Sequence, residues 1–388
     1  MVVRVLCSAE VMTMAPIFAF PALLPDFISL WGLSSAEAGW LSGVTFAGYA
    51  AAVPVLSAAT DRVDARRVHM AGATIAALAA LLFAVAAQGF WSALVWRFLA
   101  GIGLAGTYMP GLKALVDRTE GPRQPQWISW YTASFSLGTG ASFLAAGLLA
   151  GPLGWRWAFA VLGIAAALAV ALVALAVPSR RPAPRPGAPL LEVRPLLRNG
   201  PLMSYVLGYC AHMWELFGLR GWMVAFLAVA VAGQTLLTPT VTAALSSLVA
   251  MAASIGGAAL AVRFDRRRAC MVFALASSVT AIAVGLSSGW AAVVLMLLYN
   301  GLVQLDSAAL TTGAVLAAEP GRRGASMAIH SLIGFAGAFA GPLAFGWVLD
   351  LAGGPARSLA WAWAFASLGA AAALGPLALW GLNRTQRN

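Results

Sequence analysis

The sequence SRRPAPRPGAPLLEVRPLLRNGP, residues 179–201, is the only long polar segment of the chain. Its prolines prevent a continuous helix because proline lacks the backbone N–H that a helix needs. Six long apolar runs precede this segment and six follow it. We therefore expect an N-terminal bundle at 1–177, a cytoplasmic linker at 178–200 and a C-terminal bundle at 201–388.

Each apolar run is long enough to cross a bilayer, which takes about 20 mostly apolar residues. The composition agrees, because 61% of the 388 residues are hydrophobic and only 10% are charged. So few charges cannot cover the surface of a soluble protein of this length, which excludes most soluble enzymes. We expect an all-α polytopic membrane protein with twelve transmembrane helices. The expected spans are 5–29, 38–58, 68–88, 91–116, 127–150, 156–177, 202–230, 239–262, 269–287, 290–317, 326–349 and 358–381.

The distribution of basic residues predicts the orientation of these spans. Twenty of the 24 Lys and Arg residues fall in one set of loops, which predicts cytoplasmic N- and C-termini. The same topology accounts for the net charge of +11 without a nucleic-acid partner. We expect a monomer in the lipid bilayer of a bacterial-type plasma (inner) membrane.

Several kinds of chemistry have no signature in the chain. It contains no Walker loop, no GxGxxG after a strand, no HExxH and no metal-ligand cluster. We therefore expect no enzyme activity, no cofactor and no bound metal.

The two halves carry similar charges in corresponding loops, about 200 residues apart. Asp61-Arg62-Val63-Asp64-Ala65-Arg66-Arg67 follows the second run, and Asp265-Arg266-Arg267-Arg268 follows the eighth. Internal repeats of this kind are common in secondary transporters.

With these motifs the chain resembles the major facilitator superfamily over its full length. The loop signature of that family, Gly-x-x-x-Asp-Arg-x-Gly-x-Arg-Arg, is matched at its acid and its three arginines, whereas Ser57 and Asp64 replace the glycines. The stretch Arg97–Gly103 matches a second family pattern, Arg-x-x-x-Gly-x-Gly. The resemblance implies two six-helix bundles and a gate on the cytoplasmic side. The gating residues that we expect are Asp61, Arg62, Arg66, Arg67, Asp265 and Arg266.

Ionisable residues inside the expected spans are candidates for proton coupling, because charges in hydrocarbon are costly and usually functional. Glu215 lies near the middle of its span, and His212, three residues earlier, lies on the same helix face. The alternative is that Glu215 forms a buried pair with an arginine or histidine that only fixes helix packing. Asp306 either lines the pathway or pairs with arginines at the cytoplasmic end, and Glu10 lies where an inner gate is expected.

The substrate site is expected near the membrane midplane between the bundles. Arg97 stays charged, so it needs a carboxylate, carbonyl dipoles, water or an anionic substrate. Aromatic and amide side chains in the spans are further candidates, although aromatic side chains more often serve packing. The candidate substrate contacts are Arg97, Trp214, Tyr209, Tyr131, Asn300 and Tyr108.

Together these features predict a secondary active transporter that moves a small anionic solute by alternating access, coupled to H⁺. One alternative is efflux of amphipathic compounds or drugs by proton antiport. Another is a membrane sensor or scaffold that transports nothing. The string His212-Met213-Trp214-Glu215-Leu216 also resembles the nitrate/nitrite and cyanate porter groups of the same superfamily.

Overall fold

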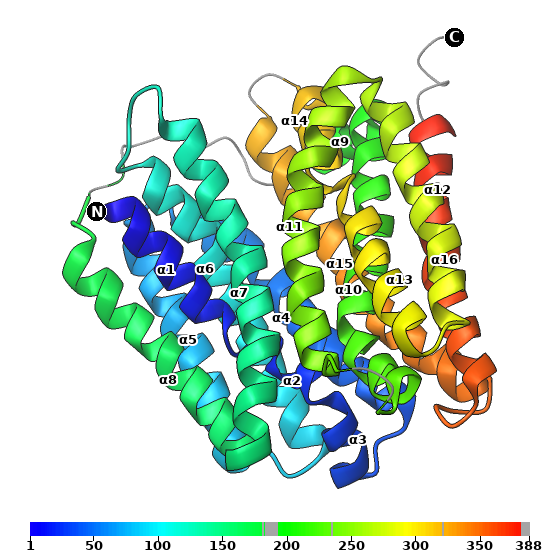
Figure 1. Ribbon diagram of the computed structural model, residues 1–388. Coiled ribbons are helices and arrows are strands. Elements are labelled where there is room, and N and C mark those ends of the chain that lie inside the picture. Colours follow the sequence, from blue (N-terminus) through cyan, green and yellow to red (C-terminus); the bar gives the residue numbers. More distant parts are fainter. Residues whose placement is uncertain (181, 183–192, 234–235, 320–321, 382–388) are drawn as a thin grey trace. The chain divides into compact units, whose positions relative to one another are not determined.

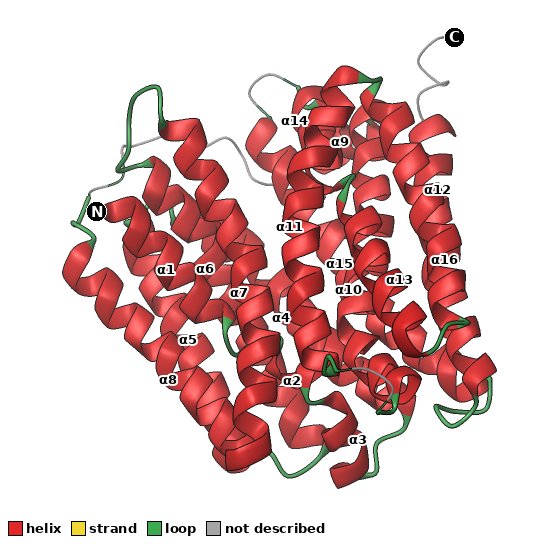
Figure 2. Ribbon diagram, in the orientation of Figure 1, coloured by secondary structure: helices red, strands yellow, loops and turns green. Residues whose placement is uncertain are grey.

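A computed structural model describes residues 1–180, 182, 193–233, 236–319 and 322–381 of the chain. Within these ranges the chain consists of helices joined by loops, without a strand (Figures 1 and 2). Eleven helical segments of the described residues, with Gly289–Ala317 counted as one segment, are long and apolar enough to cross a membrane. The predicted all-helical membrane fold is therefore confirmed.

The helix bounds agree closely with the expected spans. From the second span onward, each expected limit lies within three residues of an observed helix end. The helices before the linker are α1 (Val2–Met14), α2 (Ala19–Ala22), α3 (Leu24–Trp31), α4 (Ser35–Ala59), α5 (Ala65–Ala86), α6 (Phe90–Val116), α7 (Gln124–Leu153) and α8 (Trp155–Ala176). Those that follow are α9 (Val193–Arg198), α10 (Gly200–Val231), α11 (Pro239–Arg263), α12 (Arg266–Gly285), α13 (Gly289–Gln304), α14 (Ser307–Ala317), α15 (Arg323–Leu351) and α16 (Ser358–Gly381).

Two expected spans are interrupted. The first apolar run, expected as one helix over 5–29, consists of α1, α2 and α3, with turns at 15–18 and at Leu23. Pro16 and Pro21 fall in this run and have no N–H to donate along a helix. The tenth run, expected as one helix over 290–317, divides into α13 and α14 at Leu305 and Asp306.

Contacts between residues divide the chain into two compact units, which are described separately. Unit 1 comprises Met1–Leu33, Val44–Arg185 and Thr240–Leu248, and unit 2 comprises Ser34–Gly43, Pro186–Pro239 and Val249–Asn388. The first part of α4 thus belongs to unit 2, and the first part of α11 belongs to unit 1. Of the linker expected at 178–200, residues 181 and 183–192 lie outside the described residues, and α9 occupies its last part.

Small residues and aromatic rings pack the helices within each unit. In unit 1, α5 packs against α6 and α8, and in unit 2, α10 packs against α15 and α16 (Figure 1). A Cβ at Gly72 of α5 would lie 2.6 Å from the Cα of Gly106 in α6, so these helices touch backbone to backbone. In unit 2 the rings of Trp222 and Phe345 stack with their centroids 5.2 Å apart.

A buried carboxylate joins three elements at one end of unit 1. Asp64 begins α5 by accepting a hydrogen bond from the N–H of Arg66 at 3.0 Å. Its two oxygens also accept from Nη2 of Arg118 at 2.6 and 2.8 Å, and one accepts from the N–H of Arg180 at 2.8 Å. Arg118 in turn donates to the carbonyl of Pro178 at 2.8 Å. The start of α5, the end of α6 and the chain after α8 are therefore held together at Asp64.

These contacts also set the ionisation of Asp64. Burial raises the pKa of its carboxyl, but the hydrogen bonds from the Arg180 N–H, the Arg118 guanidinium and the Arg66 N–H outweigh burial. The pKa of Asp64 consequently lies below its ordinary value.

We predict that Asp64→Asn lowers the melting temperature of the detergent-solubilised protein. The substitution removes the negative charge and leaves one donor facing the guanidinium of Arg118, which costs about 2 kcal/mol. Because folding lowers the pKa of Asp64, its stabilisation is complete above about pH 4, its ordinary pKa, and is lost as the pH falls through the lowered value. The melting temperatures of the wild type and the variant should therefore converge in acid.

The matched control for this prediction is Asp61→Asn, at an exposed acid three residues earlier in the same loop. We expect this control to melt within about 0.5 kcal/mol of the wild type. Equal destabilisation by the two substitutions would contradict the role of Asp64.

Candidate functional site

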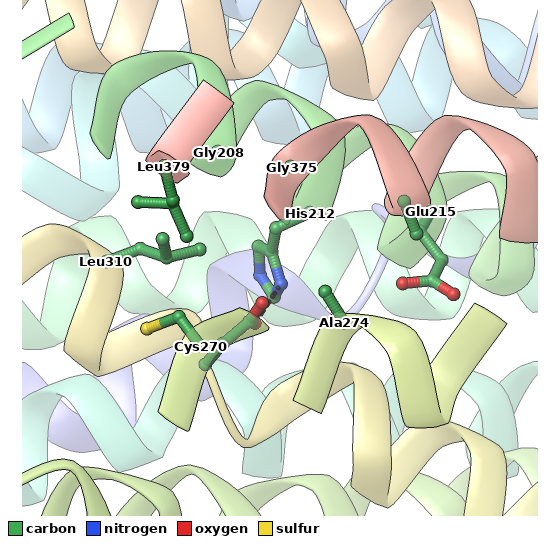
Figure 3. A pocket seen from close by; sticks show the side chains of 10 residues that line it. Gly208, His212, Glu215, Cys270, Ala274, Leu310, Gly375 and Leu379 are labelled. Carbon is green, nitrogen blue, oxygen red and sulfur yellow. Dashed lines mark ion pairs between the residues drawn. The ribbon is translucent and has the colours of Figure 1, made fainter. Parts of the chain in front are cut away.

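A stripe of polar side chains on α10 forms the centre of the candidate site in unit 2. Tyr209, His212 and Glu215 follow one another at three-residue intervals, and His212 and Glu215 are buried. In the view of Figure 3, the His212 imidazole and the Glu215 carboxyl lie on either side of the Ala274 side chain of α12. The spacing that suggested a common helix face thus places two titratable groups together inside the unit.

His212 forms an ion-pair contact across the unit. Its Nδ1 lies 2.8 Å from Oδ1 of Asp306, and the two side chains are 1% and 8% exposed. Asp306 reaches this position from the break between α13 and α14. Of the two alternatives for Asp306, the pair with cytoplasmic-end arginines is therefore replaced by a pair with histidine.

Glu215 is held by hydroxyl groups. Oγ of Ser277 in α12 donates to Oε2, and the OH of Tyr299 in α13 donates to Oε1, each at 3.0 Å. Within the described part of the chain, Glu215 has no ion pair with an arginine, lysine or histidine. A hydroxyl can donate to a carboxylate or accept from a carboxylic acid, so this pair of partners suits both protonation states.

A small cavity connects the two carboxyl groups. His212, Glu215 and Asp306 line it, together with Cys270 and Ala274 and with small and apolar side chains of α10, α14 and α16 (Figure 3). It is about the size that holds one water molecule, and it offers that water several polar partners.

An aromatic stack extends this group toward α15. The ring of Tyr209 stacks on the imidazole of His212 with centroids 5.6 Å apart and on that of His330 at 4.1 Å. Nε2 of His330 lies 3.4 Å from the hydroxyl of Thr311 in α14. Tyr209, a candidate substrate contact, therefore fills the space between two histidines.

Unit 1 contains a second buried carboxyl group. Glu10 of α1 is fully buried, and its Oε2 accepts a hydrogen bond from the OH of Tyr131 in α7 at 2.9 Å. The same hydroxyl lies 3.2 Å from the carbonyl of Thr107 and 3.0 Å from that of Tyr108, both in α6. The rings of Tyr108 and Tyr131 stack with centroids 6.2 Å apart. Three of the candidate residues named from the sequence thus meet at one place.

Two side chains supply hydrogen-bond partners to the backbone at the break after α1. Nη1 of Arg97 in α6 donates to the carbonyl of Ile17 at 2.8 Å, and its guanidinium lies over the ring of Phe20. Ser142 of α7 accepts from the N–H of Phe18 at 3.1 Å and donates to the carbonyl of Ala15 at 2.5 Å. A carbonyl dipole is one of the partners that the sequence allowed for Arg97.

The expected gating residues lie in the turn between α4 and α5 and at the starts of α5 and α12, and most of them are exposed. Asp61, Arg62 and Arg67 are exposed, whereas Arg66 donates to the carbonyl of Ala174 at the end of α8 at 2.5 Å. Asp265 begins α12 by accepting from the N–H of Arg268, and Arg266 is half-buried.

Of the remaining candidates, Trp214 is half-buried on α10 and Asn300 is fully buried in α13. Sequence reasoning missed Ser142 and Ser277 because each is one of several hydroxyl residues on its helix, and no spacing sets it apart from the others. It also gave Asp64 no role, although an aspartate just before a helical run is a typical helix start.

Long apolar helices with titratable groups buried among them define a polytopic α-helical membrane protein. In the described ranges, no three His, Cys, Asp or Glu side chains gather as a metal site would require. The sequence model of the Major Facilitator Superfamily matches residues 6–299. The chain therefore belongs to the Major Facilitator Superfamily and is a transport protein rather than an enzyme.

Solved structures of the same fold cover nearly the whole chain. A bacterial homolog of the human lysosomal transporter Spinster, in an inward-facing and occupied conformation, aligns with 99% of this chain and 96% of its own, with a TM-score of 0.81 and 18% identity. The POT family transporter PepTSo aligns with 100% of this chain and 98% of its own, with a TM-score of 0.81 and 13% identity.

Similar sequences match shorter stretches. A probable sphingolipid transporter, spinster homolog 1 of Arabidopsis thaliana, is 25% identical over 37% of this chain. A multidrug resistance protein B homolog of Mycobacterium tuberculosis is 27% identical over 45% of it. The matched stretches span 29% and 32% of the lengths of these two relatives.

We predict that Ser142→Ala lowers the melting temperature in detergent by an amount that corresponds to about 1–3 kcal/mol. The substitution leaves the N–H of Phe18 and the carbonyl of Ala15 buried at the break without the hydroxyl that joins them. The control is Thr139→Val, also buried on α7, whose hydroxyl donates to the carbonyl of Phe135 in its own helix. The same loss in both variants would show that the break does not depend on Ser142.

Proposed function

We propose that the chain is a proton-coupled secondary transporter that moves a small solute by alternating access. The observation that carries the proposal is the Glu215 carboxyl, buried in a membrane helix and held by two hydroxyls rather than by a cation. A carboxyl with a fixed cationic partner stays ionised, whereas one held by hydroxyls can gain and lose a proton without losing its contacts.

The pair formed by His212 and Asp306 is the partner of Glu215 in this proposal. Both line the cavity that Glu215 lines, and a single water in that cavity would bridge the two carboxyl groups. A proton leaving Glu215 would then pass to the contact between the imidazole and Asp306. Glu10 with Tyr131 is the corresponding candidate in unit 1.

An anionic group on the solute is the first candidate substrate chemistry. Two buried arginines, Arg97 of α6 and Arg220 of α10, supply positive charge inside the helices. Binding an anion lowers the cost of keeping a guanidinium in hydrocarbon. Trp214, Tyr209 and Asn300 are the further candidate contacts for such a group in unit 2, and Tyr131 and Tyr108 are those in unit 1.

Efflux of amphipathic compounds is the second candidate. It is favoured by the names of two relatives, a multidrug resistance protein homolog and a probable sphingolipid transporter. The two candidates differ in their need for Arg97, because an amphipathic cation gains nothing from a guanidinium.

We also propose the plasma (inner) membrane as the location, with cytoplasmic termini and with the charged loops at Asp61–Arg67 and Asp265–Arg266 forming the cytoplasmic gate. The support is the arginine content of those loops and of the linker.

The test uses proteoliposomes that enclose a pH dye. Succinate and nitrate serve as anions, and tetraphenylphosphonium serves as a lipophilic cation. Acidification driven by an inward gradient of either anion supports anion symport, and proton release driven only by the cation supports efflux. No proton movement with any probe, together with probe flux no greater than in protein-free liposomes, would favour a sensor or scaffold.

We predict that Glu215→Gln lowers solute-driven proton flux about tenfold or more, because glutamine cannot carry the proton. Exchange of labelled for unlabelled solute at equal concentrations needs no net proton movement, so it should stay within about twofold of the wild type.

The matched control for Glu215→Gln is Asp117→Asn, at a half-buried acid that pairs with Lys113 on its own helix end. We expect this control to behave as the wild type in both assays. Full proton flux in the Glu215→Gln variant would overturn the role of Glu215.

A further inference from the structure

The carboxylate of Asp350, in the last turn of α15, lies at the start of α4. Its Oδ1 accepts from the N–H of Ser35 at 3.0 Å, and its Oδ2 accepts from the N–H of Ala36 at 2.8 Å. These residues are more than 300 positions apart in sequence, yet both belong to unit 2. The first N–H groups of a helix have no partner within the helix and carry partial positive charge, so a carboxylate is favoured there.

The start of α4 also has a cap of its own. Oε2 of Glu37 accepts from the N–H and the hydroxyl of Ser34, and the N–H of Glu37 donates to the hydroxyl of Ser34. This reciprocal arrangement is a capping box, which stabilises a helix start without help from elsewhere. Asp350 accepts hydrogen bonds from the N–H groups of Ser35 and Ala36, which the capping box does not use. Its contact is therefore a link between helices rather than a requirement for α4 to begin.

Below this link, α4 and α15 touch through glycines. A Cβ at Gly39 would lie 2.4 Å from the carbonyl oxygen of Pro342, and one at Gly43 would lie 2.4 Å from that of Phe339. A Cβ at Gly346 would lie 2.1 Å from the carbonyl oxygen of Ser35. The two backbones therefore meet directly at these three glycines, and beside them the ring of Trp40 on α4 packs edge-on against that of Phe339 on α15, with centroids 5.1 Å apart.

The contact coincides with the place where α4 passes from one compact unit to the other. Ser35–Gly43 of α4 belongs to unit 2, and the rest of the helix belongs to unit 1. In a transporter that works by alternating access, the contacts closing one side must break when that side opens. The arginine distribution assigns this end of α4, opposite the loop at Asp61–Arg67, to the outer side.

We infer that Asp350 is a gate residue, a latch that holds the start of α4 on α15 while the outer side is closed. Its side chain is exposed. When the helices separate, water therefore replaces Ser35 and Ala36 as the hydrogen-bond partner of Asp350, and the latch can open reversibly. This inference rests on alternating access, as does the proposed function, but it is independent of any role of Glu215 in proton transfer.

The test measures how far α4 lies open to the outside. Ser42 of α4 is buried, and a Cβ at Gly221 of α10 would lie 3.4 Å from its own Cβ. Ser42→Cys, in a background where Cys7, Cys210 and Cys270 are replaced by serine, is labelled with a membrane-impermeant maleimide in right-side-out vesicles. Labelling needs neither a solute nor a proton gradient, so its outcome is separate from that of the proton-flux assay.

We predict that Asp350→Ala raises the labelling rate about fivefold, the change in population expected from loss of one helix-capping carboxylate. Asp350→Asn keeps the size and one acceptor, so it should give a smaller increase and serves if the alanine variant folds poorly. The matched control is Glu37→Ala, which removes the other carboxylate at the same helix start but leaves the link to α15. We expect its labelling rate to stay within about twofold of the parent.

Two results would overturn the inference. One is an unchanged labelling rate in both Asp350 variants when each elutes from a sizing column as the parent does. The other is an equal rise in the Glu37→Ala and Asp350→Ala variants, which would trace the effect to fraying of α4 alone.

Discussion

Hydrocarbon offers no hydrogen-bond partner, so every break in a membrane helix and every charge inside one must be satisfied by the protein itself. This constraint accounts for the polar contacts at both interruptions of the spans. After α1, Arg97 and Ser142 supply the partners that the interrupted backbone lacks. Between α13 and α14, the break places the Asp306 carboxyl against His212. At each break, buried polar side chains from other helices therefore contact the interrupted segment.

The same constraint distinguishes the buried carboxyl groups from one another. Asp306 is matched with an imidazole, whereas Glu215 and Glu10 are matched with the hydroxyls of Tyr299 and Tyr131. When a proton moves between an imidazole and a carboxyl group, the charge of each group changes. A hydroxyl next to a carboxyl group changes only the direction of its hydrogen bond. Unit 2 thus combines a partner that changes charge with one that tolerates either state, and a water-sized cavity joins them.

At the ends of the helices, where water is available, carboxylates act on the backbone instead. Asp64 and Asp265 begin α5 and α12, and Asp350 lies at the start of α4. Asp64 stands where the family signature has glycine, and there it binds the guanidinium of Arg118. At two of these helix starts, those of α5 and α4, the acid also connects elements that are distant in sequence.

The spans were predictable because apolar runs recur between charged loops, and the three-residue spacing of His212 and Glu215 was enough to place both on one face of α10. The interruption at 15–18 was not predictable from the sequence. Whether a proline in an apolar run bends or breaks a helix depends on the hydrogen-bond partners that neighbouring helices supply, and here that partner is Ser142. The partners of Glu215 were missed for a similar reason: Ser277 lies 62 residues away on another helix, and nothing in its local sequence marks it. Contacts such as that of Asp350 depend on tertiary packing, which a periodicity cannot reveal.

The most direct test of the account is infrared difference spectroscopy of the reconstituted protein during a pH titration, because the carbonyl stretch of a protonated carboxylic acid is distinct from that of a carboxylate. We expect a carboxylic acid band that develops as the pH is lowered and is lost in the Glu215→Gln variant but kept in the Asp117→Asn variant. A titration spectrum that is identical with and without Glu215, over the whole range in which the protein stays folded, would contradict it.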